Sequence, residues 1–225
     1  MRAPARTGPS PTAAGRRAGD EDARRFARSF GDAIRVADGH RAEAVVDEAL
    51  SNGLSAPAVH ARVITPAMYR IGELWEQAVL TPADEHLATA MCQRILASLY
   101  PRLQRESARS RARMLLAGVE GQHHVLGLRM VADVLEGAGH DVLFLGADVP
   151  VSSLVEITRR HEPALVGLTA TMPLGAGRLE EALYRLQQEV RRDLPILLGG
   201  QGVPRRLLDA GWPYAASSED VVSCA

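Results

Sequence analysis

Short apolar runs alternate with longer amphipathic stretches through the second half of the chain, and this alternation constrains the fold more than any other feature. Apolar strands that alternate with helices of about ten to fifteen residues are typical of a parallel sheet with right-handed crossovers. We therefore predict one α/β domain over residues 114–225. The expected strands are 114–118, 141–145, 164–169, 195–198 and 213–216, and the expected helices are 125–136, 151–160, 177–190 and 203–208.

The first half of the chain has a helical pattern, and we predict a helical bundle over residues 20–100. Phe26, Phe30 and Ile34 recur at a four-residue spacing, which is the period of an amphipathic helix. Thr81 precedes a proline and an acidic residue, a combination that marks the start of a helix. The expected helices are 21–37, 42–50, one from Ser55 with a kink or restart at Pro66, and one that begins after Thr81.

Composition narrows the class of protein. The 225 residues carry a net charge of −1, which gives no electrostatic argument for binding nucleic acid or an anionic membrane. Two cysteines are too few for a disulfide framework and favour a reducing cytoplasm. No apolar run approaches the roughly 20 residues of a membrane-spanning helix. Residues 1–19 are predicted to be a disordered arm and residues 101–113 a solvated linker, with a transit peptide and a nucleic-acid patch as the respective alternatives.

Chemistry-bearing residues follow three of the expected strands. His124 comes after the first strand, hydroxyl groups follow the third, and a pair of glycines follows the fourth. Ligands of open α/β sheets bind at the carboxyl ends of the strands. An imidazole can ligate a metal, hydroxyls can hold a polar group, and glycines admit a bulky ligand close to the backbone. The predicted site residues of the sheet are Gln122, His124, Gly127, Thr169, Thr171, Gly199 and Gly200.

The spacing of these residues resembles the cobalamin-binding (vitamin B12-binding) domain family, whose pattern is Asp-x-His-x-x-Gly, then Ser-x-Leu, then Gly-Gly. The resemblance implies a Rossmann-like (flavodoxin-like) domain in which His124 coordinates cobalt from the lower face. Gln122 stands where the family has Asp, and Thr171 stands where it has Leu. In the family the Asp accepts a hydrogen bond from the histidine. Gln122 is expected to accept it through its amide oxygen and to leave the histidine a weaker donor.

Two neighbouring residues are alternatives within this site. His123 is adjacent to His124, but it breaks the His-x-x-Gly spacing. Glu120 is an acid that can replace the missing Asp, although it lies at the end of the strand rather than directly before the histidine. We therefore prefer His124 as the ligand and Gln122 as its partner.

A second group of residues lies in the predicted bundle. Trp75 is followed after nine residues by Glu85 and His86, so the three side chains can meet at one end of the bundle. This spacing resembles the helical cap of light-sensing, adenosylcobalamin-dependent transcriptional regulators. The resemblance implies that Trp75 covers the upper face of the cofactor, Glu85 contacts its adenosyl group, and His86 can take the upper cobalt position after illumination. Taken one at a time, these residues also suit a packed core, a helix N-terminus and a surface position.

We interpret the chain as a regulatory photosensor, not an enzyme, that binds adenosylcobalamin between bundle and sheet. The DNA-binding domain that usually precedes such a cap is not expected upstream of Asp20, which favours a separate transcriptional regulator or self-association as the partner. A corrinoid methyl carrier that uses methylcobalamin for partner methyltransferases is the alternative. A third hypothesis is a module that reports cobalamin status without light.

Overall fold

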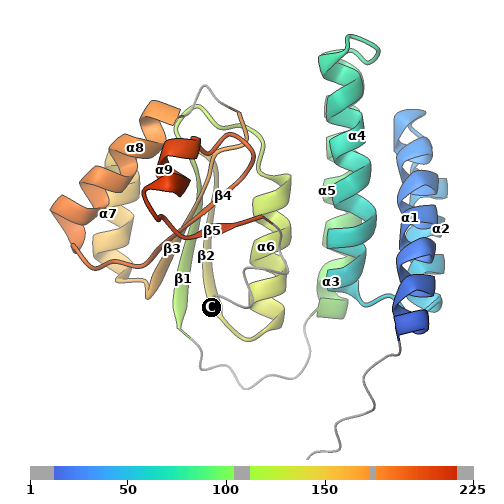
Figure 1. Ribbon diagram of the computed structural model, residues 1–225, viewed down its shortest axis with the longest axis horizontal. Coiled ribbons are helices and arrows are strands. Elements are labelled where there is room, and N and C mark those ends of the chain that lie inside the picture. The colour runs from blue at the N-terminus through green and yellow to red at the C-terminus, as the bar shows by residue number, and fades with distance from the viewer. Residues whose placement is uncertain (1–12, 104–111, 173–175, 217–225) are drawn as a thin grey trace, which may run out of the picture.

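The computed structural model describes residues 13–103, 112–172 and 176–216, which form a helical half and an α/β half lying side by side (Figure 1). Phe26, Phe30 and Ile34 of the first helix are fully buried in the core of the helical half, as their spacing predicts. The helical elements are α1 (Ala13–Arg35), α2 (Gly39–Ser51), α3 (Ala56–Val59), the π-helical segment η1 (His60–Ile64), α4 (Thr65–Glu76) and α5 (Pro82–Leu103).

Local hydrogen bonds explain where several of these helices begin. The Asp38 carboxylate accepts from the Arg41 N–H at the start of α2, and the Ser55 hydroxyl accepts from the Ala58 N–H at the start of α3. Before α5, the Thr81 N–H donates to Asp84 Oδ2 over 2.8 Å, and the Asp84 N–H donates to Thr81 Oγ1 over 3.2 Å. This reciprocal pair is a capping box, and it confirms the helix start predicted after Thr81.

The ends of the helical half differ from the prediction. The first helix begins at Ala13, so the part of the expected arm from residue 13 onwards is wrong, because alanine and arginine favour a helix more strongly than the scattered glycines oppose it. Residues 1–12 lie outside the described residues. The last helix continues through Pro101 to Leu103, so the linker prediction is wrong there. Residues 104–111, which make up most of the rest of the expected linker, lie outside the described residues.

The α/β half contains a parallel sheet with the strand order β2-β1-β3-β4-β5. This is the order of a flavodoxin-like sheet, so the predicted fold class is confirmed. The elements are β1 (Arg113–Val119), α6 (Leu126–Gly137), β2 (Asp141–Val149), α7 (Val151–His161), β3 (Leu165–Thr169), α8 (Ala176–Arg185), the π-helical segment η3 (Leu186–Val190), β4 (Ile196–Gly199), α9 (Arg205–Asp209) and β5 (Tyr214–Ala215).

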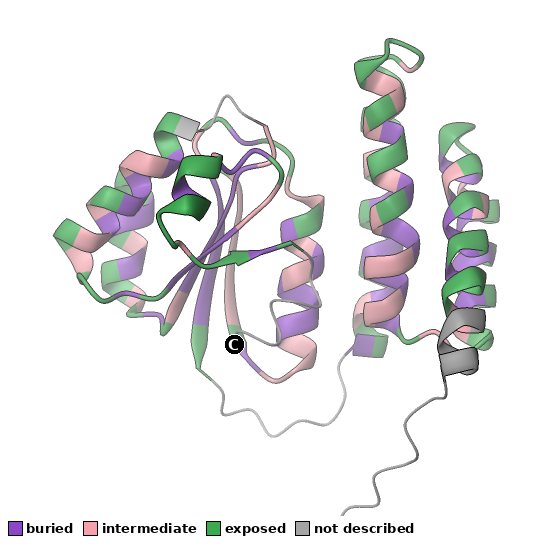
Figure 2. Cartoon of the chain, viewed as in Figure 1, coloured by how far each residue is buried: buried purple, intermediate pink, exposed green. Residues whose placement is uncertain are grey.

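Helices cover both faces of the sheet. The helix α6 packs on one face with Leu128 and Leu135, and α7 and α8 pack on the other with Leu154 and Leu179. Buried residues accordingly run through the sheet and along the inward sides of the helices (Figure 2). The opposite side of α6 packs against α5, and its Met130 joins the core of the bundle. In the described ranges no helix combines the length and the apolar character needed to cross a membrane.

Candidate functional site

The sheet brings the predicted site residues of three strands to one edge. The strand β3 lies between β1 and β4, and Thr169 pairs in register with Gly118 on one side and with Gly199 on the other. The segment that carries His124 follows β1, Thr171 follows β3, and Gly200 follows β4. All three segments leave the sheet at the carboxyl ends of parallel strands, where the fold binds ligands.

His124 lies in the irregular segment between β1 and α6, and its side chain is exposed. The hydroxyl of Thr171 donates to the backbone carbonyl of His124 over 3.2 Å, which ties this segment to the end of β3. His123 is exposed as well, so exposure alone does not separate the two histidines. His124 remains the predicted ligand because it has the His-x-x-Gly spacing and because its backbone is fastened to the neighbouring strand end.

Gln122 does not have the role expected from the sequence. Its side chain is fully buried, and its Oε1 accepts hydrogen bonds from the backbone N–H groups of Thr171 (2.7 Å) and Met172 (2.9 Å). Its Nε2 donates to the Met172 carbonyl over 2.9 Å. Both acceptor positions of the amide oxygen are therefore occupied. The expected hydrogen bond from His124 is wrong in this structure, because the longer side chain reaches the turn after β3 instead.

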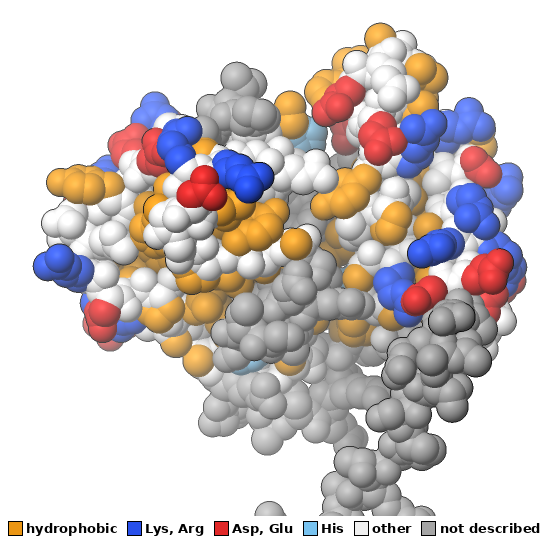
Figure 3. Space-filling view, viewed as in Figure 1, with side chains coloured by type: hydrophobic (Ala, Val, Ile, Leu, Met, Phe, Trp, Pro, Cys, Tyr) orange, Lys and Arg blue, Asp and Glu red, His pale blue; other side chains and the backbone are white. Residues whose placement is uncertain are grey.

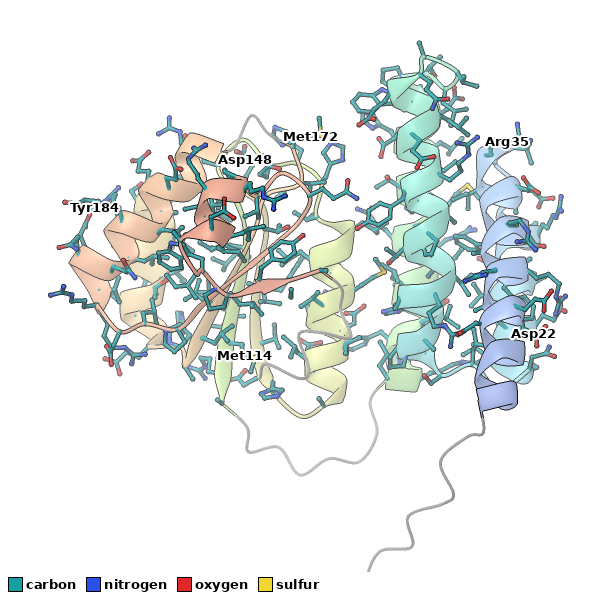
Figure 4. All side chains as sticks on the ribbon, viewed as in Figure 1. Asp22, Arg35, Met114, Asp148, Met172 and Tyr184 are labelled. Atoms are coloured by element: carbon teal, nitrogen blue, oxygen red, sulfur yellow. The ribbon has the colours of Figure 1, made fainter. Side chains whose placement is uncertain are left out.

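The acid that was the alternative partner also points elsewhere. Glu120 Oε1 lies 3.5 Å from Arg178 Nη2 of α8, so its charge is paired with that guanidinium. A residue that the sequence reading missed is Asp148, at the end of β2. Its Oδ1 accepts from the Gly121 N–H over 2.7 Å, and its own N–H donates to the Gln122 carbonyl over 2.9 Å. Asp148 and Met172 lie at the same end of the sheet half (Figure 4).

The glycines of the site have different structural roles. Gly200 has a φ of +93°, and a Cβ there would lie 2.4 Å from the Ala170 carbonyl oxygen, so the turn after β4 requires glycine. A Cβ at Gly199 would meet only the Ala215 carbonyl oxygen, at 3.6 Å, and one at Gly127 would meet nothing within 4 Å. Gly127 therefore leaves open space at the start of α6, beside the histidine segment.

The hydroxyls of the site are used within the protein. Thr169 is buried, and its Oγ1 donates to the Gly199 carbonyl over 3.2 Å. Thr171 is half-buried and donates to His124 as described above. A hydroxyl oxygen that donates can still accept. The expectation that Thr169 and Thr171 hold the nucleotide tail of the cofactor therefore stays a prediction.

At one end of the bundle, Glu85 and His86 contact each other, and Trp75 lies near the end of the preceding helix. Trp75 is half-buried near the end of α4, and Glu85 lies in the first turn of α5, after the connecting turn. The Glu85 carboxylate is buried: its Oε2 lies 2.7 Å from His86 Nδ1, and its Oε1 accepts from the Thr89 hydroxyl over 2.7 Å. The His86 side chain is 77% exposed. Its Nδ1 is thus held by the carboxylate, which leaves Nε2 directed outward.

The predicted site residues belong to different halves of the molecule. Trp75, Glu85 and His86 lie in the helical half, and the residues at the strand ends lie in the α/β half. In Figure 1 the turn between α4 and α5 and the carboxyl ends of the strands lie on the same side of the molecule. No hydrogen bond or ion pair joins Trp75, Glu85 or His86 to the predicted site residues of the sheet within the part of the chain that the structure describes. Hydrophobic and uncharged atoms prevail where the described parts of the halves meet in Figure 3, and the charged side chains gather farther out.

The donor set suits a corrinoid. Cobalt accepts imidazole nitrogen, and a neutral histidine is the form that binds. The exposed His124 has open space beside it at Gly127. The exposed ring of His86 is oriented by a buried carboxylate, as histidines that ligate a metal commonly are.

Comparisons with known proteins identify both halves. Residues 112–219 and residues 27–100 each match a family described as B12 binding domain. The HTH-type transcriptional repressor CarH of Myxococcus xanthus is 32% identical over 190 residues, which cover 82% of this chain and 62% of the repressor. Trimethylamine corrinoid protein 1 of Methanosarcina acetivorans is 27% identical over 199 residues, which cover 85% of this chain and 91% of that protein.

A solved structure shows the same fold. The monomethylamine corrinoid protein of Methanosarcina barkeri superposes with a TM-score of 0.76 at 21% identity, over 89% of this chain and 96% of that chain. At this identity the likeness concerns the arrangement of the helical and sheet halves. The two family matches together span both halves and support cobalamin binding. The chain therefore belongs to the B12 binding domain family.

Proposed function

We propose that the chain is a cobalamin-binding light sensor in which illumination changes an interface with a second copy of the chain or with a separate regulator. The observation that carries the proposal is the Trp75, Glu85 and His86 group at one end of the bundle, combined with the histidine at the edge of the sheet. The 32% identity to a transcriptional repressor agrees with a regulatory role.

The residues would act as follows. Bound adenosylcobalamin would supply a cobalt–carbon bond that light cleaves. His124 would ligate the metal from the sheet side, and Trp75 would cover the opposite face and exclude water. Glu85 accepts hydrogen bonds from both His86 and Thr89, so it fixes the tautomer of His86 with the proton on Nδ1. Nε2 would then carry the lone pair that could bind cobalt.

An absorption experiment tests the proposal. The protein is loaded with adenosylcobalamin in the dark, and its spectrum and oligomeric state are recorded before and after illumination. We expect a light-dependent spectral change in the wild type, a different final spectrum in His86→Ala, and loss of histidine ligation in His124→Ala. His40→Ala is the matched control, because His40 is an exposed histidine at the start of α2. No spectral change upon illumination of the loaded wild type would contradict the proposal.

A corrinoid methyl carrier is the second candidate, and a specific observation favours it. A trimethylamine corrinoid protein is 27% identical over 199 residues, which cover 85% of this chain and therefore reach into both of its halves. A carrier would hold a methyl group as methylcobalamin and pass it between partner methyltransferases, and His86→Ala would leave that transfer unchanged. The effect of this substitution therefore separates the two functions.

A further inference from the structure

Gln122 makes more side-chain hydrogen bonds than the other described residues of the candidate site, and its side chain is shielded from solvent. It is 0% exposed. Its amide makes three hydrogen bonds, all with the backbone of Thr171 and Met172 and all between 2.7 and 2.9 Å. Buried amides that lose such partners leave unsatisfied polar groups and are costly. The position therefore holds two chain segments together.

The bonds around Gln122 fasten the histidine segment on both sides. Toward β3, the amide of Gln122 grips the turn at Thr171, and the Thr171 hydroxyl in turn donates to the His124 carbonyl over 3.2 Å. Toward β2, the Gln122 carbonyl accepts from the Asp148 N–H, and the Asp148 carboxylate accepts from the Gly121 N–H. The segment that carries His124 is thus held by hydrogen bonds on both sides, toward β3 and toward β2.

We propose that Gln122 is a positioning residue that sets the place of His124 by clamping its segment to the Thr171–Met172 turn, and that it is not a hydrogen-bond partner of the imidazole. The inference rests on the proposed binding of cobalamin through His124. The strength of the histidine ligand is then set by the position of the segment, because no charged partner at residue 122 polarises the ring.

Two substitutions distinguish a clamp from an imidazole partner. Gln122→Ala removes all three side-chain bonds. Gln122→Glu keeps the size and the two accepted bonds, but its second oxygen faces the Met172 carbonyl and can bond to it only when protonated. A clamp therefore predicts that Gln122→Glu holds the histidine less well than glutamine does. A partner of the imidazole predicts the reverse, because an ionised carboxylate strengthens a histidine ligand.

Electron paramagnetic resonance reads the axial ligand directly. Protein with nitrogen-15 histidine is loaded with hydroxocobalamin of natural isotope content and reduced to the cobalt(II) state. A protein histidine then splits the cobalt lines into doublets, and the cofactor's own base splits them into triplets. Gln201→Ala is the matched control, because Gln201 is an exposed glutamine in the turn after β4.

We expect doublets in the wild type and in Gln201→Ala, mostly triplets in Gln122→Ala, and a smaller share of doublets in Gln122→Glu than in the wild type. In the cofactor-free protein, amide exchange at Thr171 and Met172 should be about tenfold faster in Gln122→Ala. Should Gln122→Ala fail to fold, Gln122→Glu carries the test, since it preserves the side-chain volume.

The outcomes separate this inference from the proposed function. Doublets in the wild type and undiminished doublets in Gln122→Ala would overturn the clamp and leave cobalamin binding through a histidine intact. A doublet signal in Gln122→Glu as strong as in the wild type would also overturn it, in favour of an imidazole partner. Triplets in the wild type would overturn both, because no protein histidine would then be the ligand.

Discussion

Replacing His60 by leucine, at the contact between bundle and sheet, should make the stability of the protein fall as the pH rises from 4 to 6. His60 begins the π-helical segment η1 and is 0% exposed, and neither of its ring nitrogens makes a hydrogen bond of ordinary geometry within the described residues. Burial lowers its pKa from 6.5 to about 4, and a contact with the backbone of Met130 opposes this in part. The ring is therefore neutral in the folded protein.

The direction of the effect follows from proton uptake. Between pH 4 and 6.5 the unfolded chain binds a proton at His60 and the folded protein does not, so this residue makes stability rise with pH. A lowering from 6.5 to about 4 corresponds to about 3 kcal/mol over this range. The stabilisation is complete above pH 6.5 and is lost as the pH falls toward 4.

Asp133 on α6 acts in the opposite direction. Burial raises its pKa from 3.8 to about 6, although the guanidinium of Arg129, with Nη2 at 2.7 Å from Asp133 Oδ1, opposes this. Between pH 4 and 6 the folded protein holds the proton that the unfolded chain has lost, so stability falls with rising pH by about 2.5 kcal/mol. The two residues therefore nearly cancel in the wild type.

Urea unfolding at pH 4, 5, 6 and 7 measures this compensation. We expect these two groups to leave the unfolding free energy of the wild type nearly constant between pH 4 and 6. His60→Leu should lose stability as the pH rises, and Asp133→Asn should gain it. His40→Leu, at an exposed histidine, is the control and should follow the wild type. The reasoning is refuted if His60→Leu keeps the pH dependence of the wild type.

Three further predictions concern the site. Gly200→Ala should destabilise the protein by about 2 kcal/mol or more in thermal unfolding, because the left-handed backbone and the Ala170 carbonyl exclude a Cβ. Gly127→Ala should leave the cofactor-free protein as stable as the wild type or stabilise it by about 0.5 to 1 kcal/mol, while it weakens cobalamin binding in a titration. Glu85→Gln should release the fixed tautomer of His86, seen as a changed nitrogen chemical shift of its ring, and an unchanged shift would contradict the assigned contact.

The sequence predicts the fold well where one periodicity dominates. The expected strand 164–169 became β3 (Leu165–Thr169), and the expected helix 125–136 became α6 (Leu126–Gly137). The errors lie at the ends of helices, where the spacing of apolar residues gives no signal. The helix α1 starts at Ala13 before the first apolar stripe, and α5 continues past Pro101, because the preceding turns already hold the helix and the loss of one N–H is tolerated near its end.

The site could be located from the sequence, but not its internal bonds. The spacing placed His124, Thr169 and Gly199 at neighbouring strand ends, as their register in the sheet requires. Spacing along the chain does not report which way a side chain turns, and so it missed that Gln122 bonds across to Met172. The role of Asp148 was also missed, since an acid after an apolar strand gives no sign of its partner on another loop.

The helix α6 connects the histidine segment to the core of the helical half. It begins directly after the histidine segment that Gln122 clamps, and one turn later Met130 enters the core of the bundle beside His60. Arg129 lies between the Tyr100 ring of α5 and the Phe144 ring of β2, with its charged group 5.5 Å from each ring centre. A shift of the histidine segment therefore has to move α6 against α5 or be absorbed within one helical turn. Packed helices have few intermediate arrangements, so variants at Gln122 report on one end of this connection and variants at His60 on the other.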